Sequence, residues 1–171
     1  LCHIRPVDSL VYGHLGSKHT KECIERFNET PVGKVERKSR FFRLDSQGLC
    51  HTLRAGTGRD NGSHTAPRPI HYQVPRCITI REAARLHTFP DWFQFHRTIW
   101  HGFREIGNAV IPLLAKSLGD EVIKVMGVDV KGLDIIKLES VNSNYLSFKM
   151  SQAAAFWDLS SEIIPQRKGA V

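Results

Sequence analysis

Apolar and polar positions alternate with helical spacing in three stretches of the chain. In the first stretch, Ile24 and Phe27 fall on one face of a segment that follows Thr20. A threonine here can accept hydrogen bonds from the free amides of a helix start, and Pro31 cannot continue a helix. The pattern predicts a helix from Lys21 to about Glu29.

The other two helices are marked by their ends. Thr79 and Glu82 have the spacing of a capping box, which predicts a helix from Ile80 to about His87. A longer helix is expected between Pro112, which suits a first turn, and Gly127, which suits a C-terminal cap. The apolar face of this longer helix comprises Val110, Leu113, Leu114, Leu118, Val122 and Val125.

Outside these helices the pattern favours loops and short strands, so the expected fold class is α+β. A short strand is expected from Leu133 to Leu138. Residues 151–164 have the spacing of two helical pieces, and Pro165 would cut the second to about one turn. We interpret this tail as a small packing appendage.

The charge of the chain points to an anionic partner. Among 171 residues there are 24 Lys and Arg against 17 Asp and Glu, a net charge of +7, and the excess lies in residues 1–119. Nucleic acid is the first candidate for a partner, although on charge alone a merely soluble basic protein is an equal reading. The composition is globular, and no apolar run approaches the ~20 residues of a membrane helix, so no membrane partner is expected.

The cysteines and histidines do not predict a metal site. Cys2, Cys23, Cys50 and Cys77 contain no Cys-x-x-Cys pair, and the spacing of the histidines includes no matching acidic partner. Reduced thiols that serve as packing residues are the simpler interpretation.

Two segments carry candidate chemistry. Residues 34–43 hold five positive charges around two phenylalanines, which suits either contact with a phosphate backbone or a solvated edge strand. Residues 52–62 hold three glycines among Arg, Thr and Asn, the side-chain types that contact phosphates and base edges. Taken alone, the second segment reads better as a surface loop, and it lacks the Gly-Lys-Ser/Thr ending of a nucleotide-binding loop.

Two further stretches favour nucleic-acid contact over the other interpretations of these two segments. Residues 76–91 (RCITIREAARLHTFPD) followed by Phe103-Arg-Glu-Ile-Gly-Asn-Ala-Val110 resemble the last two conserved motifs of DNA (cytosine-5) methyltransferases. Upstream, Arg43-Leu-Asp with residues 48–57 (GLCHTLRAGT) resembles the end of the target recognition region of that family. The resemblance covers roughly residues 10–127.

The resemblance implies site residues. Asn108, Ala109 and Val110 would line the pocket for S-adenosylmethionine, the cofactor of the family, although Ile111 stands where the family usually has proline. The recognition loops would contact double-stranded DNA through Arg40, Thr52, Arg54, Gly56, Thr57, Gly58 and Arg59. The helix that begins at Ile80 would organise these loops against the catalytic domain.

The resemblance also implies an arrangement of the chain. Residues 1–75 would be a partial target recognition region of short strands and loops, 76–127 the last two motifs as two helices, and 128–171 a C-terminal extension. The helices would pack on a Rossmann-like methyltransferase domain that the chain lacks. We therefore expect binding to an amino-terminal catalytic half, or self-association through the exposed apolar face.

The catalytic residues of the family are missing. No cysteine follows a proline, no Glu-Asn-Val occurs, and the single Gly-x-Gly at positions 56–58 lacks the phenylalanine of the cofactor loop. The leading hypothesis is a C-terminal fragment or subunit of a DNA cytosine-5 methyltransferase, inactive by itself, in the bacterial cytoplasm at the nucleoid. The alternatives are a non-catalytic DNA-binding module derived from such an enzyme and a protein-interaction domain with incidental basic character.

Overall fold

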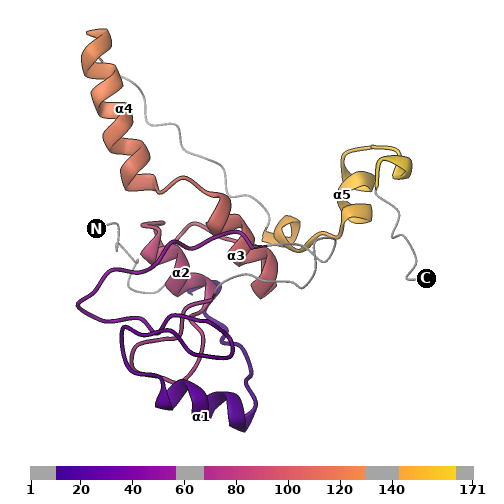
Figure 1. Ribbon diagram of the computed structural model, residues 1–171. Coiled ribbons are helices and arrows are strands. Elements are labelled where there is room, and N and C mark those ends of the chain that lie inside the picture. The colour runs from indigo at the N-terminus through magenta and orange to yellow at the C-terminus, as the bar shows by residue number, and fades with distance from the viewer. Residues whose placement is uncertain (1–10, 57–67, 130–142, 165–171) are drawn as a thin grey trace. The chain divides into compact units, whose positions relative to one another are not determined.

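The computed structural model describes residues 11–56, 68–129 and 143–164 (Figure 1). The chain divides into two compact units, residues 1–133 and 134–171. The predicted strand at 133–138 and the candidate DNA residues Thr57, Gly58 and Arg59 lie outside the described residues.

The three helices predicted from the sequence are confirmed. Helix α1 spans Lys21–Glu29, and the side chain of Thr20 accepts a hydrogen bond from the amide of Cys23. Helix α2 spans Ile80–Leu86, and both hydrogen bonds of its capping box are present. Helix α4 spans Pro112–Met126 and ends at Gly127, whose φ of 64° is the left-handed conformation of a glycine cap.

A fourth helix in this unit, α3, spans Ile99–Asn108 and was not predicted. It buries Phe103 and Ile106 and packs against α2. Gly102 makes the close approach possible, because a Cβ atom there would lie 2.7 Å from the Cδ1 atom of Ile80 and 3.0 Å from the carbonyl oxygen of His96. Residues 76–127 therefore contain three helices rather than the two expected.

The expected short strands are absent from the described residues. Pairing there is limited to isolated bridges, Val35 with Phe42, Arg43 with Ile70, and Ile70 with Cys77. The guanidinium group of Arg43, which is buried, donates to the carbonyl oxygens of residues 27, 28, 30 and 72 at 2.8–3.2 Å. Arg43 thus satisfies carbonyl groups that the C-terminal end of α1 leaves without a helical partner, together with the carbonyl of residue 72. The segments around it are held by isolated bridges and turns.

The main core lies between α2, α3 and the loops that precede them. Its buried members are Leu44, Leu53, Ile78, Ile80, Ala83, Ala84, Phe103 and Ile106. A smaller cluster of Phe27, Ile70 and Cys77 holds α1 to the following loops. Residues 44–53 of the predicted recognition region therefore share one core with the two helices of the conserved motifs.

Arg81 joins α2 to the segments on either side of it. Its side chain is 1% exposed and donates to the carbonyl oxygens of Tyr12 (2.9 Å), Pro90 (3.1 Å) and Phe93 (2.6 Å). Asp91 lies 3.9 Å from Arg81 and also accepts two hydrogen bonds from Arg85. These bonds satisfy the buried charge and fix the chain after α2.

The second unit is small. It contains the 3₁₀ turn η2 (Ser143–Ser147), helix α5 (Met150–Phe156) and the single 3₁₀ turn η3 (Ser161–Ile163). The rings of Tyr145 and Phe156 lie 4.8 Å apart between centroids and form an aromatic cluster. The helical pieces expected in residues 151–164 are confirmed. None of the helices in the described ranges is long and apolar enough to cross a membrane.

Candidate functional site

A buried carboxylate builds the turn that carries the basic residues. Glu36 is 4% exposed, and its carboxylate accepts hydrogen bonds from the backbone amides of Lys38 (3.0 Å) and Ser39 and lies 3.4 Å from the Nε atom of Arg26. Arg40 closes the turn with a φ of 59°, and its amide donates to the carbonyl of Glu36 at 2.9 Å. We call residues 36–41 the basic turn.

Glu36 is ionised at neutral pH. Burial raises the pKa of this carboxyl, but hydrogen bonds from Ser39 and Lys38 and the charge of Arg26 outweigh burial and bring the pKa to about 2. The side chains of Arg37, Lys38 and Arg40 are exposed around this anchor. The turn therefore presents three cations to solvent on a backbone that is tied down.

The second candidate segment, residues 52–56, is fixed by one apolar anchor. Leu53 is 5% exposed and belongs to the main core, whereas its neighbours Thr52 and Arg54 are exposed. Gly56 has a φ of 73°, a conformation that side chains other than glycine rarely adopt. We call residues 52–56 the recognition segment.

The basic turn and the recognition segment lie side by side where residues that flank them stack on each other. The ring of Phe42, which follows the basic turn, stacks on the ring of His51, which precedes the recognition segment, with 3.9 Å between the centroids. Arg40, Thr52, Arg54 and Gly56 therefore lie on neighbouring segments of one unit.

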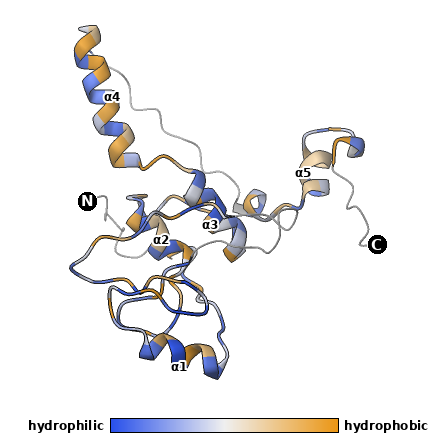
Figure 2. Cartoon of the chain, viewed as in Figure 1, coloured by the Kyte–Doolittle hydropathy of each residue, from blue (hydrophilic) through white to orange (hydrophobic). Residues whose placement is uncertain are grey.

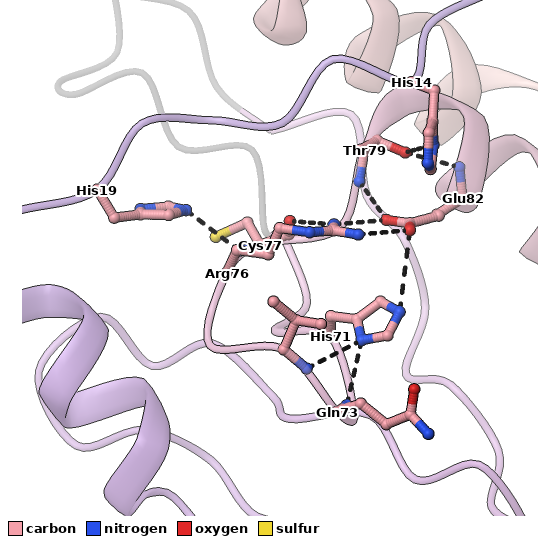
Figure 3. A network of polar contacts seen from close by, with 9 residues as sticks. His14, His19, His71, Gln73, Arg76, Cys77, Thr79 and Glu82 are labelled. Atoms are coloured by element: carbon pink, nitrogen blue, oxygen red, sulfur yellow. Dashed lines mark hydrogen bonds and ion pairs between the residues drawn. The ribbon is translucent and has the colours of Figure 1, made fainter. Parts of the chain in front are cut away.

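A polar network holds the start of α2 (Figure 3). Both terminal nitrogens of Arg76 donate to the carboxylate of Glu82 at 2.8 Å, and the backbone amide of Thr79 donates to the same carboxylate at 2.8 Å. The hydroxyl of Thr79 lies 3.1 Å from the Nδ1 atom of His14 and 3.1 Å from the backbone nitrogen of Glu82. The network ties the first described residues of the chain to the start of α2.

The expected cofactor residues form a link between two helices. Asn108 is the last residue of α3, Ala109 is its C-cap and donates its amide to Ile106 at 3.1 Å, and Val110 is 65% exposed. These residues therefore lie at the end of α3, and Ile111, the N-cap of α4, separates them from the next helix. We call residues 108–110 the cofactor turn.

The residues of this turn fit the chemistry of S-adenosylmethionine. Asn108 is an exposed amide that can donate and accept, Ala109 is small and half-buried, and Val110 offers an exposed apolar side chain. A ligand with both polar and apolar parts could contact residues of these three kinds.

One contact between the two candidate sites was missed by sequence reasoning. A Cβ atom on Gly107 would lie 2.3 Å from the backbone nitrogen of Ala55 and 2.4 Å from the carbonyl carbon of Arg54. The peptide bond of the recognition segment therefore rests directly on the residue before the cofactor turn. The glycine in the motif is the signal that could have suggested such a contact.

Helix α4 exposes its apolar residues. None of its side chains is buried, and Leu118, Val122 and Val125 are 58%, 57% and 85% exposed. Hydrophobic residues recur along the whole helix in Figure 2. Within the described part of the chain, this apolar face of α4 is left exposed.

No group of three or more His, Cys, Asp or Glu side chains within the described ranges is placed to hold a metal ion. The cysteines at positions 23, 50 and 77 are free thiols, and burial raises the pKa of Cys77 to about 11. At neutral pH this thiol is protonated and is a packing residue of the smaller cluster.

Comparison with known proteins identifies the family to which this fold and these segments belong. The profile of the C-5 cytosine-specific DNA methylases matches residues 8–124, and the chain belongs to this family.

The individual relatives are methyltransferases of bacteria and plants. The type II methyltransferase M.XorII of Xanthomonas oryzae pv. oryzae is 45% identical over 95% of this chain, and DNA (cytosine-5)-methyltransferase 2 of Arabidopsis thaliana is 45% identical over 54%. The crystal structure of a protein described as a DNA modification methyltransferase of an E. coli prophage is similar with a TM-score of 0.58, at 41% identity over 68% of this chain. The matches span 38%, 6% and 30% of these three proteins, so this chain spans well under half the length of each.

Proposed function

We propose that the chain supplies DNA target recognition and part of the S-adenosylmethionine pocket of a DNA cytosine-5 methyltransferase. The observation that carries the proposal is the placement of exposed Thr52 and Arg54 on either side of buried Leu53, next to the basic turn. Phosphate contacts position a protein on DNA and base contacts specify the sequence, and both need polar side chains on a rigid base.

The cofactor part of the proposal rests on the cofactor turn. Asn108 would hydrogen-bond the ligand, Ala109 would allow its close approach, and Val110 would cover an apolar part of it. When bound, S-adenosylmethionine supplies the methyl group that is transferred to C5 of cytosine. The residues of this chain would bind and orient this donor, since the sequence holds no cysteine after a proline to act as the nucleophile.

A catalytic half would complete the site. The exposed apolar face of α4 suits the surface of a second folded unit, because an uncovered apolar stripe of this length is unfavourable in water. We therefore expect this half, carried outside the 171 residues, to cover α4 and to bring the nucleophile to the cofactor turn.

DNA binding tests the recognition part. Fluorescence anisotropy with labelled duplex DNA at several salt concentrations should show binding that weakens as salt rises. Arg54→Ala should weaken binding about tenfold, which is the loss expected for an arginine that contacts a base or a phosphate. Arg97→Ala is the matched control, since Arg97 is also exposed but lies outside both segments. Equal effects of the two changes would contradict the assigned contacts.

Reconstitution tests the cofactor part. The chain is mixed with the catalytic part of the X. oryzae relative that lacks the matched region, and transfer of labelled methyl groups from S-adenosylmethionine to duplex DNA is measured. Asn108→Ala should raise the cofactor concentration for half-maximal rate by about fivefold, the loss of one hydrogen bond. Asn28→Ala, on the exposed surface of α1, is the control and should leave this concentration unchanged.

The same experiment separates the alternative function. A non-catalytic DNA-binding module would bind duplex DNA selectively by itself and would give no methyl transfer with any catalytic half. The exposed basic residues are compatible with such a module. The cofactor turn would have no ligand there, because the module transfers no methyl group.

A further inference from the structure

The recognition segment and the cofactor turn are in contact through backbone atoms. The peptide bond between Arg54 and Ala55 lies where a side chain on Gly107 would have to be, with 2.3–2.7 Å between that Cβ position and three backbone atoms. Backbone atoms cannot move aside as the end of a flexible side chain can. A displacement of residues 54–55 toward α3 must therefore move the last turn of α3 as well.

The recognition segment cannot relieve such a displacement locally. Leu53 packs in one cluster with Phe103 and Ile106, and Ile106 directly precedes Gly107. Closely packed interiors transmit strain because they contain few voids into which side chains can relax. The segment is thus bound to α3 both by a side chain and by its backbone, one residue before the cofactor turn begins.

The start of α4, which follows the cofactor turn, is held by Thr88. Its hydroxyl oxygen accepts a hydrogen bond from the backbone amide of Leu113 at 3.2 Å, in the first turn of α4, where Ile111 gives no side-chain cap. Thr88 has a φ of 61°, which β-branched residues rarely adopt. Such strain persists where surrounding structure holds it, and here Thr88 directly follows α2 and its C-cap His87.

We propose that Gly107 and Thr88 are positioning residues that couple DNA binding at the recognition segment to the conformation of the cofactor turn. The proposal rests on the proposed function, since it takes the recognition segment as the DNA contact. Gly107 transmits the position of residues 54–55 to the end of α3, and Thr88 keeps the start of α4 on α2. DNA that holds the recognition segment then also holds residues 107–113, and a ligand bound to the turn strengthens DNA binding reciprocally.

Amide hydrogen exchange of the 171-residue chain, with and without linear plasmid DNA, tests the coupling without any need for activity. DNA should slow exchange in residues 52–56 and also in residues 107–113, the latter by about fivefold or more. Slowing in 52–56 with no change in 107–113 would overturn the coupling and leave the proposed function standing. No slowing in either segment would overturn both.

Two pairs of variants separate coupling from simple stability. Gly107→Ala should weaken DNA binding and abolish the DNA effect on residues 107–113, whereas Gly119→Ala should change neither, since a Cβ on Gly119 meets nothing within 4 Å. Thr88→Val removes the hydroxyl but keeps the shape of the side chain. In this variant DNA should still slow exchange in residues 52–56, but it should no longer slow exchange in the first turn of α4. Thr88→Ser, which keeps a hydroxyl, should restore the slowing in α4. If Thr88→Val leaves the effect on α4 intact, Thr88 has no positioning role, and if Gly107→Ala behaves as Gly119→Ala does, Gly107 has none.

Discussion

Glu82 remains ionised in a half-buried position because its partners are all donors. Burial raises the pKa of this carboxyl, but hydrogen bonds from Arg76 and from the amide of Thr79, together with the charges of Arg76 and His71, bring the pKa to about 2. His71, whose pKa is lowered by burial, lies 3.9 Å from the carboxylate and accepts backbone amides at its Nδ1 atom.

The lowered pKa of Glu82 predicts how stability depends on pH. A carboxyl with a usual pKa of 4.5 and a folded-state pKa of about 2 stabilises the fold above pH 4.5, and this contribution is lost as the pH falls toward 2. Urea unfolding followed by circular dichroism should therefore show a free energy of unfolding that decreases across this range. Glu82→Gln should lower stability at pH 7 and flatten the decrease. Glu25→Gln, on the exposed face of α1, should leave the slope unchanged.

Residue environments within the basic stretch could not be predicted from the sequence. Arg40 and Arg43 are three positions apart in one run of positive charge, yet Arg40 is exposed and Arg43 is buried with its guanidinium on four carbonyl oxygens. Those carbonyls belong to α1, its C-terminal end and residue 72, and they come together only in the folded chain. The pattern of charges identifies such a stretch, but it does not tell which cations are free to contact a ligand and which ones stabilise the fold.

At the scale of elements, α1, α2 and α4 were predictable because the sequence marks their ends, by Pro112 and Gly127 in the case of α4, whereas α3 was not. Thr20 and Thr79 cap α1 and α2 with local hydrogen bonds that depend on residues three positions apart, so the sequence contains the signal. Thr98 gives α3 no such bond, and Gly102 lowers the helix propensity of this segment. Tertiary packing of Phe103 and Ile106 stabilises α3, and packing is not a local property.

The two caps also predict different costs of removal. Thr79→Ala should lower the free energy of unfolding by about 2 kcal/mol, the upper end for an N-cap, because Thr79 is buried and its hydroxyl also contacts His14. Thr20→Ala should cost about 1 kcal/mol or less at the exposed start of α1. Denaturant unfolding of the two variants checks this order, and equal losses would contradict the role of the Glu82 network.

At the scale of the whole molecule, the apolar face of α4 predicts association. Sedimentation velocity of the isolated chain should show species larger than the monomer as concentration rises, together with binding of hydrophobic dyes. Leu118→Gln combined with Val122→Gln should restore the monomer and change the free energy of unfolding by less than about 0.5 kcal/mol, since no residue of α4 is buried. The matched control is Lys116→Gln with Lys124→Gln on the polar face. A wild-type chain that stays monomeric would contradict the prediction.

The candidate site was predictable in its residue types but not in its internal contacts. The motif around Asn108 and the alternation of Thr52, Leu53 and Arg54 are visible in the sequence, and the exposure of Thr52 and Arg54 agrees with that pattern. The contact of Gly107 with residues 54–55 joins positions more than fifty residues apart and depends on how α3 packs. Such contacts follow from tertiary structure, which periodicity and capping do not specify.

The exposure of α4 also bears on how long the chain survives in a cell. A helix without buried side chains opens at little free-energy cost, and proteases cut segments that open often. On the proposed function, a catalytic half that covers α4 would protect the copies that it binds from this cleavage, whereas surplus copies would remain open to it. Turnover would then match the amount of the chain to the amount of its covering partner, with no need for equal rates of synthesis.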